Sequence, residues 1–357
     1  MENNKADRYF IVVIKLKIMN FSKLEKMDSQ KMYKIYDDWP QIAKESFSTN
    51  DELESFENID HIVFSGMGGS GAIGDMFASI LSKTKIHVNV VKGYLLPETV
   101  NPNTLVVIIS VSGNTVETLS VLESAKKVKC KIIAFTSGGK IQEFCTKNNI
   151  KYKIVPKFHS PRATFTSYLY TILKILHITL SIKEKDILES IKKLEDLSKK
   201  INSLNLTDSN PSLNLAKWIT NIPIIYYPFG LQAAAIRFKN SLQENCKIHA
   251  IAEDVIEACH NGIVSWERKS DILPILIRGN KDNIKTKQRY EILKEFLNKN
   301  GVEYKEIVSV DGNILSKIIN LIYLLDYASI YNAVINNTDP SPVKSIDFVK
   351  KKLNKLK

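Results

Sequence analysis

The chain has 357 residues, of which 44% are hydrophobic, and its formal net charge is +12. This length and composition exclude a disordered or fibrous protein and allow about two globular domains. The positive charge comes from lysine-rich helical stretches, such as residues 198–200 and 350–355, rather than from a basic stripe interleaved with aromatic side chains, so a nucleic-acid-binding protein is not expected.

The N-terminal region and the cysteines indicate in which cellular compartment the protein is expected. The apolar run Tyr9–Ile14 is much shorter than the roughly 20 residues that cross a bilayer, so we expect no membrane span. Four cysteines lie far apart without a Cys-x-x-Cys pair, and no secretory signal pattern is present, which indicates a reducing cytoplasm. The globular pattern begins near Met27 or Met32, so residues 1–29 are expected to form a loose N-terminal extension.

From Asp60 to about Ile182, apolar runs of strand length alternate with helical patterns, which predicts a doubly wound α/β domain. The five strand candidates are residues 61–65, 87–91, 105–110, 131–136 and 152–155. An amphipathic Lys/Glu-rich stretch at residues 182–201 then predicts a connecting helix.

The alternation resumes after this helix, which predicts a second domain of similar architecture. Its strand candidates are residues 222–227, 247–252, 272–277 and 304–307, and its helical segments include residues 284–298 and 314–334. A proline-containing turn at residues 339–343 and a basic helix from about residue 344 end the chain. We therefore predict an α/β fold of two doubly wound parallel sheets, each in a three-layer αβα sandwich, with a C-terminal helix. The predicted divisions are the extension 1–29, a first domain 30–182, a connecting helix 183–206 and a second domain 207–357.

Two loops rich in glycine and hydroxyl groups follow predicted strands of the first domain, at residues 66–75 and 110–118. Glycine lets the backbone approach an anion closely, hydroxyls donate hydrogen bonds, and the start of a helix supplies unpaired N–H groups. Neighbouring parallel strands would place both loops at one edge of the sheet. The pair therefore predicts a phosphate-binding site.

A dinucleotide site is the alternative for the first loop, which fits Gly-x-Gly-x-x-Gly at Gly66, Gly68 and Gly71. Such a site expects an acidic residue about 20 residues further on. The second predicted strand ends instead at Lys92, and the hydroxyl-rich second loop has no role in that scheme. Either loop alone could also be an ordinary tight turn without a ligand.

Five short motifs, in their order and spacing, resemble those of the archaeal bifunctional phosphoglucose/phosphomannose isomerases, which are built from two sugar isomerase (SIS) domains. The motifs are residues 66–71, 110–115, 160–162, 243–245 and 259–261. The resemblance covers nearly everything after about residue 30. It implies an aldose–ketose isomerase that acts on glucose 6-phosphate and mannose 6-phosphate without cofactor or metal. It also implies that Gly69, Ser70, Ser110, Ser112 and Thr115 hold the substrate phosphate.

The same resemblance assigns Glu244 as the base that moves a proton between C2 and C1 of the open-chain sugar, and Arg162 as the cation that stabilises the enediol(ate). The chemistry agrees with these roles. One carboxylate near both carbons can act first as general base and then as general acid. A fixed guanidinium can stabilise the charge that develops on oxygen. Taken singly, either residue could be an ordinary surface residue.

Ring opening needs groups that move protons at the ring oxygen and the C1 hydroxyl, and the resemblance assigns these to His260 and a C-terminal lysine. A near-neutral imidazole suits this task, and His260 precedes a polar loop. In related isomerases this histidine comes from the neighbouring subunit, which implies a homodimer with shared active sites. Counting back from Leu353 selects Lys350, although Lys351 and Lys352 adjoin it.

Two positions depart from the family pattern. Gly262 stands where the family has an acidic residue after His-Asn, so the surroundings of His260 are expected to differ. A threonine linked to tolerance of the mannose epimer falls at or near Val343, with Ser341 close by. Acceptance of mannose 6-phosphate therefore depends on this region.

A SIS-type sensor that binds a sugar phosphate without turnover is the alternative function. Glu244, Arg162 and His260 together favour the enzyme, because a sensor needs none of them. No His/Cys/Glu cluster has metal-ligand spacing, which argues against the zinc-dependent type of phosphomannose isomerase.

Overall fold

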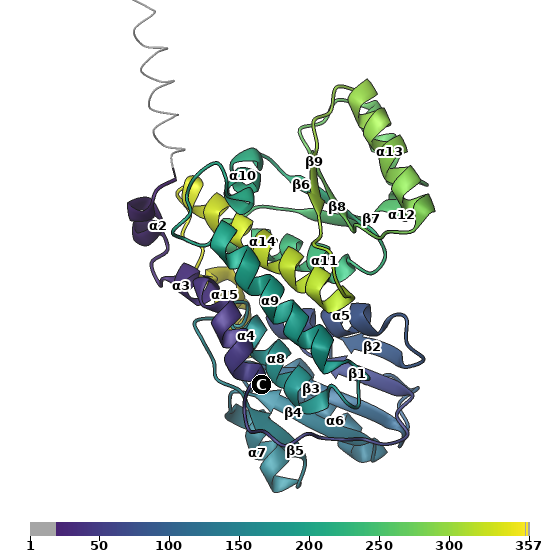
Figure 1. The fold of residues 1–357 in the computed structure, drawn as a ribbon. Helices are drawn as coiled ribbons and strands as arrows, with labels where there is room; N and C mark the ends of the chain where they lie inside the picture. The colour runs from purple at the N-terminus through teal and green to yellow at the C-terminus, as the bar shows by residue number, and fades with distance from the viewer. Residues whose placement is uncertain (1–18, 354, 356–357) are drawn as a thin grey trace, which may run out of the picture.

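The computed structural model describes residues 19–353 and 355 and contains two parallel sheets (Figure 1). The first sheet has the order β2-β1-β3-β4-β5. Its strands are β1 (His61–Ser65), β2 (His87–Val91), β3 (Thr104–Ser110), β4 (Lys131–Thr136) and β5 (Lys151–Ile154). All seven residues of β3 are buried, as expected for a central parallel strand covered on both faces. The helices around this sheet are α5 (Gly69–Leu81), α6 (Val116–Val128), α7 (Gly139–Lys147) and α8 (Phe165–Leu176).

The second sheet repeats the arrangement with one strand fewer, in the order β7-β6-β8-β9. Its strands are β6 (Pro223–Tyr227), β7 (Ile251–Asp254), β8 (Leu273–Arg278) and β9 (Lys305–Val308). Its helical segments are α10 (Pro211–Trp218), α11 (Gln232–Ser241), the π-helix η1 (Leu242–Cys246), α12 (Val255–Ala258), the 3₁₀-helix η2 (Gly262–Glu267) and α13 (Ile284–Lys299). The predicted α/β class with two parallel sheets is confirmed.

Long helices join the two halves into one core. The connecting helix α9 (Glu184–Ile201) packs against α14 (Ile314–Ile335), and α4 (Trp39–Phe47) packs against α8 and α9 (Figure 1). One cluster of buried side chains includes residues of both sheets and of these helices. By length and composition α14 could cross a membrane, but 94% of its apolar window is buried inside the protein. A helix that is apolar all round is the expected form of such a core helix.

The predicted loose extension does not hold for its described part. Residues 1–18 lie outside the described residues. Met19 is buried, and Leu24 of α2 (Phe21–Met27) is fully buried in the shared core. The following helix is α3 (Met32–Asp37). The chain therefore joins the fold before Met27, through a helix too short to show a clear apolar period.

The C-terminal helix is α15 (Lys344–Leu353), as predicted. The second predicted strand of the second half begins later than expected, at Ile251 rather than Lys247. Lys247 takes a left-handed conformation (φ 59°) that ends η1, so it cannot belong to a strand.

Candidate active site

The two glycine- and hydroxyl-rich loops meet at one edge of the first sheet. Strands β1 and β3 are parallel neighbours, with Ser65 opposite Ile108, so the loops that follow them leave the sheet side by side. The Val111 N–H donates to Ser70 Oγ at 3.4 Å and joins the loops directly. This arrangement matches the geometry predicted for a phosphate site.

Hydroxyl groups converge where α6 begins. Thr115 Oγ1 lies 3.1 Å from Ser110 Oγ and 3.3 Å from Ser112 Oγ. Thr115 is the N-cap residue of α6, yet its side chain makes no capping hydrogen bond. Ser112 is exposed and Ser110 is buried beneath it. Three hydroxyls beside unpaired helix N–H groups form an environment that suits a phosphate dianion.

Glycines allow the close approaches in this region. A Cβ on Gly113, whose φ is +66°, would lie 1.7 Å from the Gly138 carbonyl oxygen. A Cβ on Gly69 would lie 3.0 Å from the Pro161 carbonyl and 3.2 Å from the Arg162 nitrogen. The first loop therefore packs its backbone directly against the segment that carries Arg162.

The Arg162 side chain is held by hydrogen-bond partners from two distant segments. Its Nη1 lies 3.2 Å from Glu244 Oε2, and its Nε donates to Asn245 Oδ1 at 2.7 Å. Its Nη2 donates to the carbonyl oxygens of Pro340 (2.7 Å) and Ser341 (2.8 Å). Only 5% of this side chain is exposed. A guanidinium held so completely can act as an immobile cation.

Glu244 lies on the π-helix η1, directly after α11. Single π-turns in helices occur frequently at functional sites, because the inserted residue re-aims the side chains around it. The Glu244 side chain is 26% exposed, so the carboxylate contacts Arg162 and still reaches solvent. Its neighbour Asn245 is fully buried and donates from Nδ2 to Ser329 Oγ at 2.8 Å, which anchors η1 to α14.

Lys247 is a part of the site that sequence reasoning missed. Its Nζ donates to the carbonyl oxygens of Glu244 and Asp339, each at 2.8 Å, and so ties η1 to the segment that holds Arg162. Burial lowers the pKa of Lys247, and the positive charge of Arg162 lowers it further. The only sequence signal was a cation three residues after the predicted base.

A buried ion pair between Arg237 and Asp326 holds the backbone of Arg162 in place. Arg237 Nη2 lies 2.6 Å from Asp326 Oδ2 and also donates to the Arg162 carbonyl oxygen at 2.8 Å. Ser241 Oγ donates to Asp326 Oδ1 at 2.7 Å, and Tyr36 Oη to Oδ2 at 3.1 Å. Burial alone would lower the pKa of Arg237, but the Asp326 carboxylate together with Tyr36 and Glu244 raises it above its ordinary value. The backbone position of Arg162 therefore depends on a fully desolvated pair.

Family comparisons agree with this arrangement. Residues 208–353 match the bacterial phospho-glucose isomerase C-terminal SIS domain, and residues 55–180 match the SIS domain. A bifunctional phosphoglucose/phosphomannose isomerase from Caldicellulosiruptor bescii is 35% identical over 311 residues, which cover 84% of this chain and 91% of that protein. The chain belongs to the bifunctional phosphoglucose/phosphomannose isomerase family.

One further relative and one solved structure resemble this chain over most of its length. A bifunctional phosphoglucose/phosphomannose isomerase from Aquifex aeolicus is 31% identical over 323 residues, which cover 89% of this chain and 95% of that protein. A hypothetical protein from Thermus thermophilus shares the fold, with a TM-score of 0.72 and 13% identity over 99% of this chain and 96% of that chain. The predicted family and its two SIS domains are confirmed.

In the described part of the chain, the two predicted ring-opening residues do not bond to the Arg162–Glu244 pair. His260 follows α12 and is exposed, and in the described part of the chain no hydrogen bond of its imidazole is found. Lys350 is exposed on α15. Within residues 19–353 and 355, neither side chain forms a hydrogen bond or ion pair with Arg162 or Glu244. The contacts of the described residues thus join the two hydroxyl-rich loops and Arg162 with Glu244.

The family departure at Gly262 has a local explanation. A Cβ on Gly262 would lie 2.7 Å from Glu253 Oε2, so the Glu253 carboxylate occupies the space beside the His-Asn motif. Burial raises the pKa of Glu253, and the carboxylates of Glu257 and Asp254 raise it further. Glu253 of β7 therefore places an acidic group beside the His-Asn motif, where the family has an acidic side chain at the position of Gly262.

A second polar network holds the segment that contacts Arg162. Ser341 Oγ donates to Asp28 Oδ1 at 2.8 Å and lies 3.2 Å from His159 Nε2. Burial lowers the pKa of His159. Asp28 belongs to the N-terminal region predicted as loose, so this region contributes to the support of the site. Among the described residues, no group of three His, Cys, Asp or Glu side chains is placed to hold a metal ion.

Proposed function

We propose that this chain is an aldose–ketose isomerase that interconverts glucose 6-phosphate and mannose 6-phosphate with fructose 6-phosphate. The observation that carries the proposal is the 3.2 Å contact between Arg162 and Glu244, beside the loop that begins α5. A sugar-phosphate sensor needs neither an immobilised guanidinium nor an accessible carboxylate next to it. Family membership likewise favours the enzyme over the sensor.

The substrate phosphate binds the hydroxyl loops, through Gly69 and the side chains of Ser70, Ser110, Ser112 and Thr115. This anchors one end of the sugar and presents its C1 and C2 atoms to Glu244. The carboxylate removes the C2 proton, the enediol(ate) forms, and the same group returns the proton to C1. Arg162 stabilises the negative charge on the enediolate oxygen, and because its hydrogen bonds are already made, it needs little reorganisation.

Ring opening uses His260 of the partner subunit and Lys350, which makes the enzyme a homodimer with shared active sites. The exposure of both side chains supports this part of the proposal, because each is available to a second chain or to a moving C-terminal helix. The reaction requires no cofactor or metal, and the enzyme works in the cytoplasm. We place the domain division at residues 30–182 and 207–357, joined by residues 183–206.

Mannose 6-phosphate differs from glucose 6-phosphate at C2, so its acceptance depends on groups near that carbon. Ser341 supports a role for the segment before α15, because its carbonyl oxygen binds Arg162 while its hydroxyl is held by Asp28. Val343 lies two residues further on and is half-buried. Both epimers lose their C2 stereochemistry in a common enediol, so one base serves both when the bound sugar can present either face of C2 to it.

Isotope exchange tests the proton transfer. Fructose 6-phosphate is incubated with the protein in D₂O, and the glucose 6-phosphate that forms is analysed for deuterium at C2. Proton transfer by Glu244 predicts deuterium at C2, because the protonated carboxyl can exchange with solvent at 26% side-chain exposure. Product without any solvent deuterium, formed at a normal rate, would contradict this mechanism and indicate hydride transfer.

A further inference from the structure

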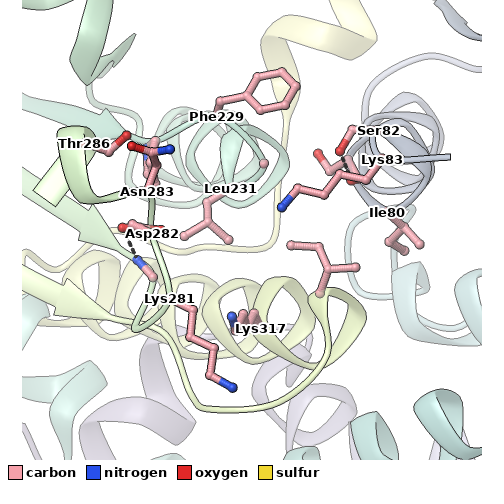
Figure 2. A pocket seen from close by; sticks show the side chains of 15 residues that line it. Ile80, Ser82, Lys83, Phe229, Leu231, Lys281, Asp282, Asn283, Thr286 and Lys317 are labelled. Carbon is pink, nitrogen blue, oxygen red and sulfur yellow. Dashed lines mark hydrogen bonds between the residues drawn. The ribbon is translucent and has the colours of Figure 1, made fainter.

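A cavity of about 570 Å³ opens at the edge of the second sheet (Figure 2), and neither Arg162 nor Glu244 lines it. This volume lies in the range of small-molecule sites, roughly 300–1,000 Å³. Three segments of the second half line it: the loop between β6 and α11, the loop between β8 and α13, and the start of α14. The end of α5 and the residues after it, from Ser79 to Lys83, supply the opposite wall.

The position of this cavity mirrors that of the candidate active site. In the first half, the loops after the adjacent strands β1 and β3 carry the proposed phosphate site. In the second half, the cavity is lined by the loops after the adjacent strands β6 and β8. The sheet orders β2-β1-β3 and β7-β6-β8 show that these strands correspond.

The two helices that follow these strands complete the correspondence. Helices α5 and α11 pack against each other. The start of α5 contacts Arg162 through Gly69, and the end of α11 continues into η1 with Glu244. At the other end of the helix pair, the loop that leads into α11 and the end of α5 line the cavity. The cavity is therefore the duplicate of the active site, with the segment after α5 standing where η1 stands in the active site.

The chemistry of the cavity differs from that of the active site in one respect. Its lining includes Lys83, Lys281 and Lys317, and none of these three forms an ion pair within the described part of the chain. Figure 2 shows the Lys83 side chain reaching from the end of α5 toward Leu231. Asp282 is the one carboxylate in the lining, and it accepts a hydrogen bond from the Gly279 N–H at 2.8 Å. The segment after α5 supplies an ammonium where η1 supplies a carboxylate.

We infer that this cavity is a second, non-catalytic binding site for a small phosphomonoester such as a sugar phosphate. Three ammonium groups against one carboxylate favour a dianion, and ammonium groups bind phosphate oxygens as point charges. Ser79, Ser82, Asn283 and Thr286 offer hydrogen bonds to the rest of the ligand. The segment after α5, which corresponds to η1, contributes no carboxylate to the lining, so we expect the ligand to bind without turnover.

Binding stoichiometry tests this site. Glucose 6-phosphate is titrated by calorimetry into full-length protein carrying Glu244→Gln, which prevents turnover. Two binding equivalents per chain are expected. Adding Lys83→Gln, Lys281→Gln and Lys317→Gln should leave one equivalent. A charge-matched control, Lys127→Gln, Lys185→Gln and Lys299→Gln, replaces exposed lysines elsewhere and should keep two.

The outcomes separate this inference from the proposed function. If the lysine variant binds as many equivalents as its parent, the second site does not exist. If the parent binds one equivalent and the lysine variant binds none, the second site stands and the phosphate assignment in the first domain fails. Glucose without phosphate should bind only weakly at the second site, and inorganic phosphate should compete there. With Glu244 intact, the lysine variant should isomerise glucose 6-phosphate at an unchanged rate.

Discussion

Replacing Glu244 with glutamine tests the assignment of the catalytic base with little change in structure. The amide oxygen of glutamine can still accept the hydrogen bond that Arg162 Nη1 donates at 3.2 Å, so η1 and the guanidinium should keep their positions. What is lost is the ability to take up a proton from carbon. General acid–base groups contribute about 10²- to 10⁴-fold to rate, which corresponds to about 3–5 kcal/mol of transition-state stabilisation.

The assay compares kcat and KM for glucose 6-phosphate isomerisation in the two proteins. We expect kcat to fall by about 10²- to 10⁴-fold while KM changes little, because the loops proposed to bind the substrate phosphate are not altered. Glu303→Gln is the matched control, since this glutamate is exposed, and it should leave both constants unchanged. A variant with kcat within about threefold of the unmodified protein would refute the role of Glu244.

Three further changes probe the support of the site and the ring-opening groups. Asp326→Asn leaves the buried Arg237 guanidinium without its counter-charge. Urea denaturation should show a free energy of unfolding lower by about 3–5 kcal/mol, and a loss below about 1 kcal/mol would contradict the importance of this pair. Co-expressed His260→Gln and Glu244→Gln chains should recover about one quarter of normal activity, because half of the dimers are mixed and one of their two shared sites is intact; no recovery above the single variants would argue against sharing. Lys350→Gln should lower kcat for the cyclic sugar by about tenfold, whereas Lys352→Gln should leave kcat unchanged. Equal effects of the two changes would contradict a specific role of Lys350 in ring opening.

The fold and the meeting of the two hydroxyl-rich loops could be predicted because their signals are local. An unbroken apolar run such as residues 105–109, followed at once by Ser110, Ser112 and Gly113, specifies a buried parallel strand and a tight loop within nine residues. The requirement for glycine at position 113 follows from its φ of +66° and the nearby Gly138 carbonyl. Neighbouring strands then bring two such loops together without further information.

The contacts that complete the site are not local, and the sequence could not show them. Arg162 and Glu244 are separated by 82 positions, and their meeting depends on how α11 ends in a π-helix, for which the sequence has no distinct pattern. No sequence pattern indicates the left-handed conformation of Lys247, so the strand was predicted to begin four residues too early. The N-terminal helix was misjudged because Leu24 is a single buried apolar residue among lysines. The resemblance to a family selected the motifs, and the structure shows that Arg162 meets both Glu244 and the first loop.

The central claim is that this chain isomerises both epimeric aldose phosphates with its own side chains. The most direct measurement is turnover of purified, chelator-treated protein with glucose 6-phosphate and, separately, mannose 6-phosphate, with detection of fructose 6-phosphate. We expect fructose 6-phosphate from both substrates. No product from either substrate, with binding of both intact, would contradict the claim and indicate a sugar-phosphate sensor.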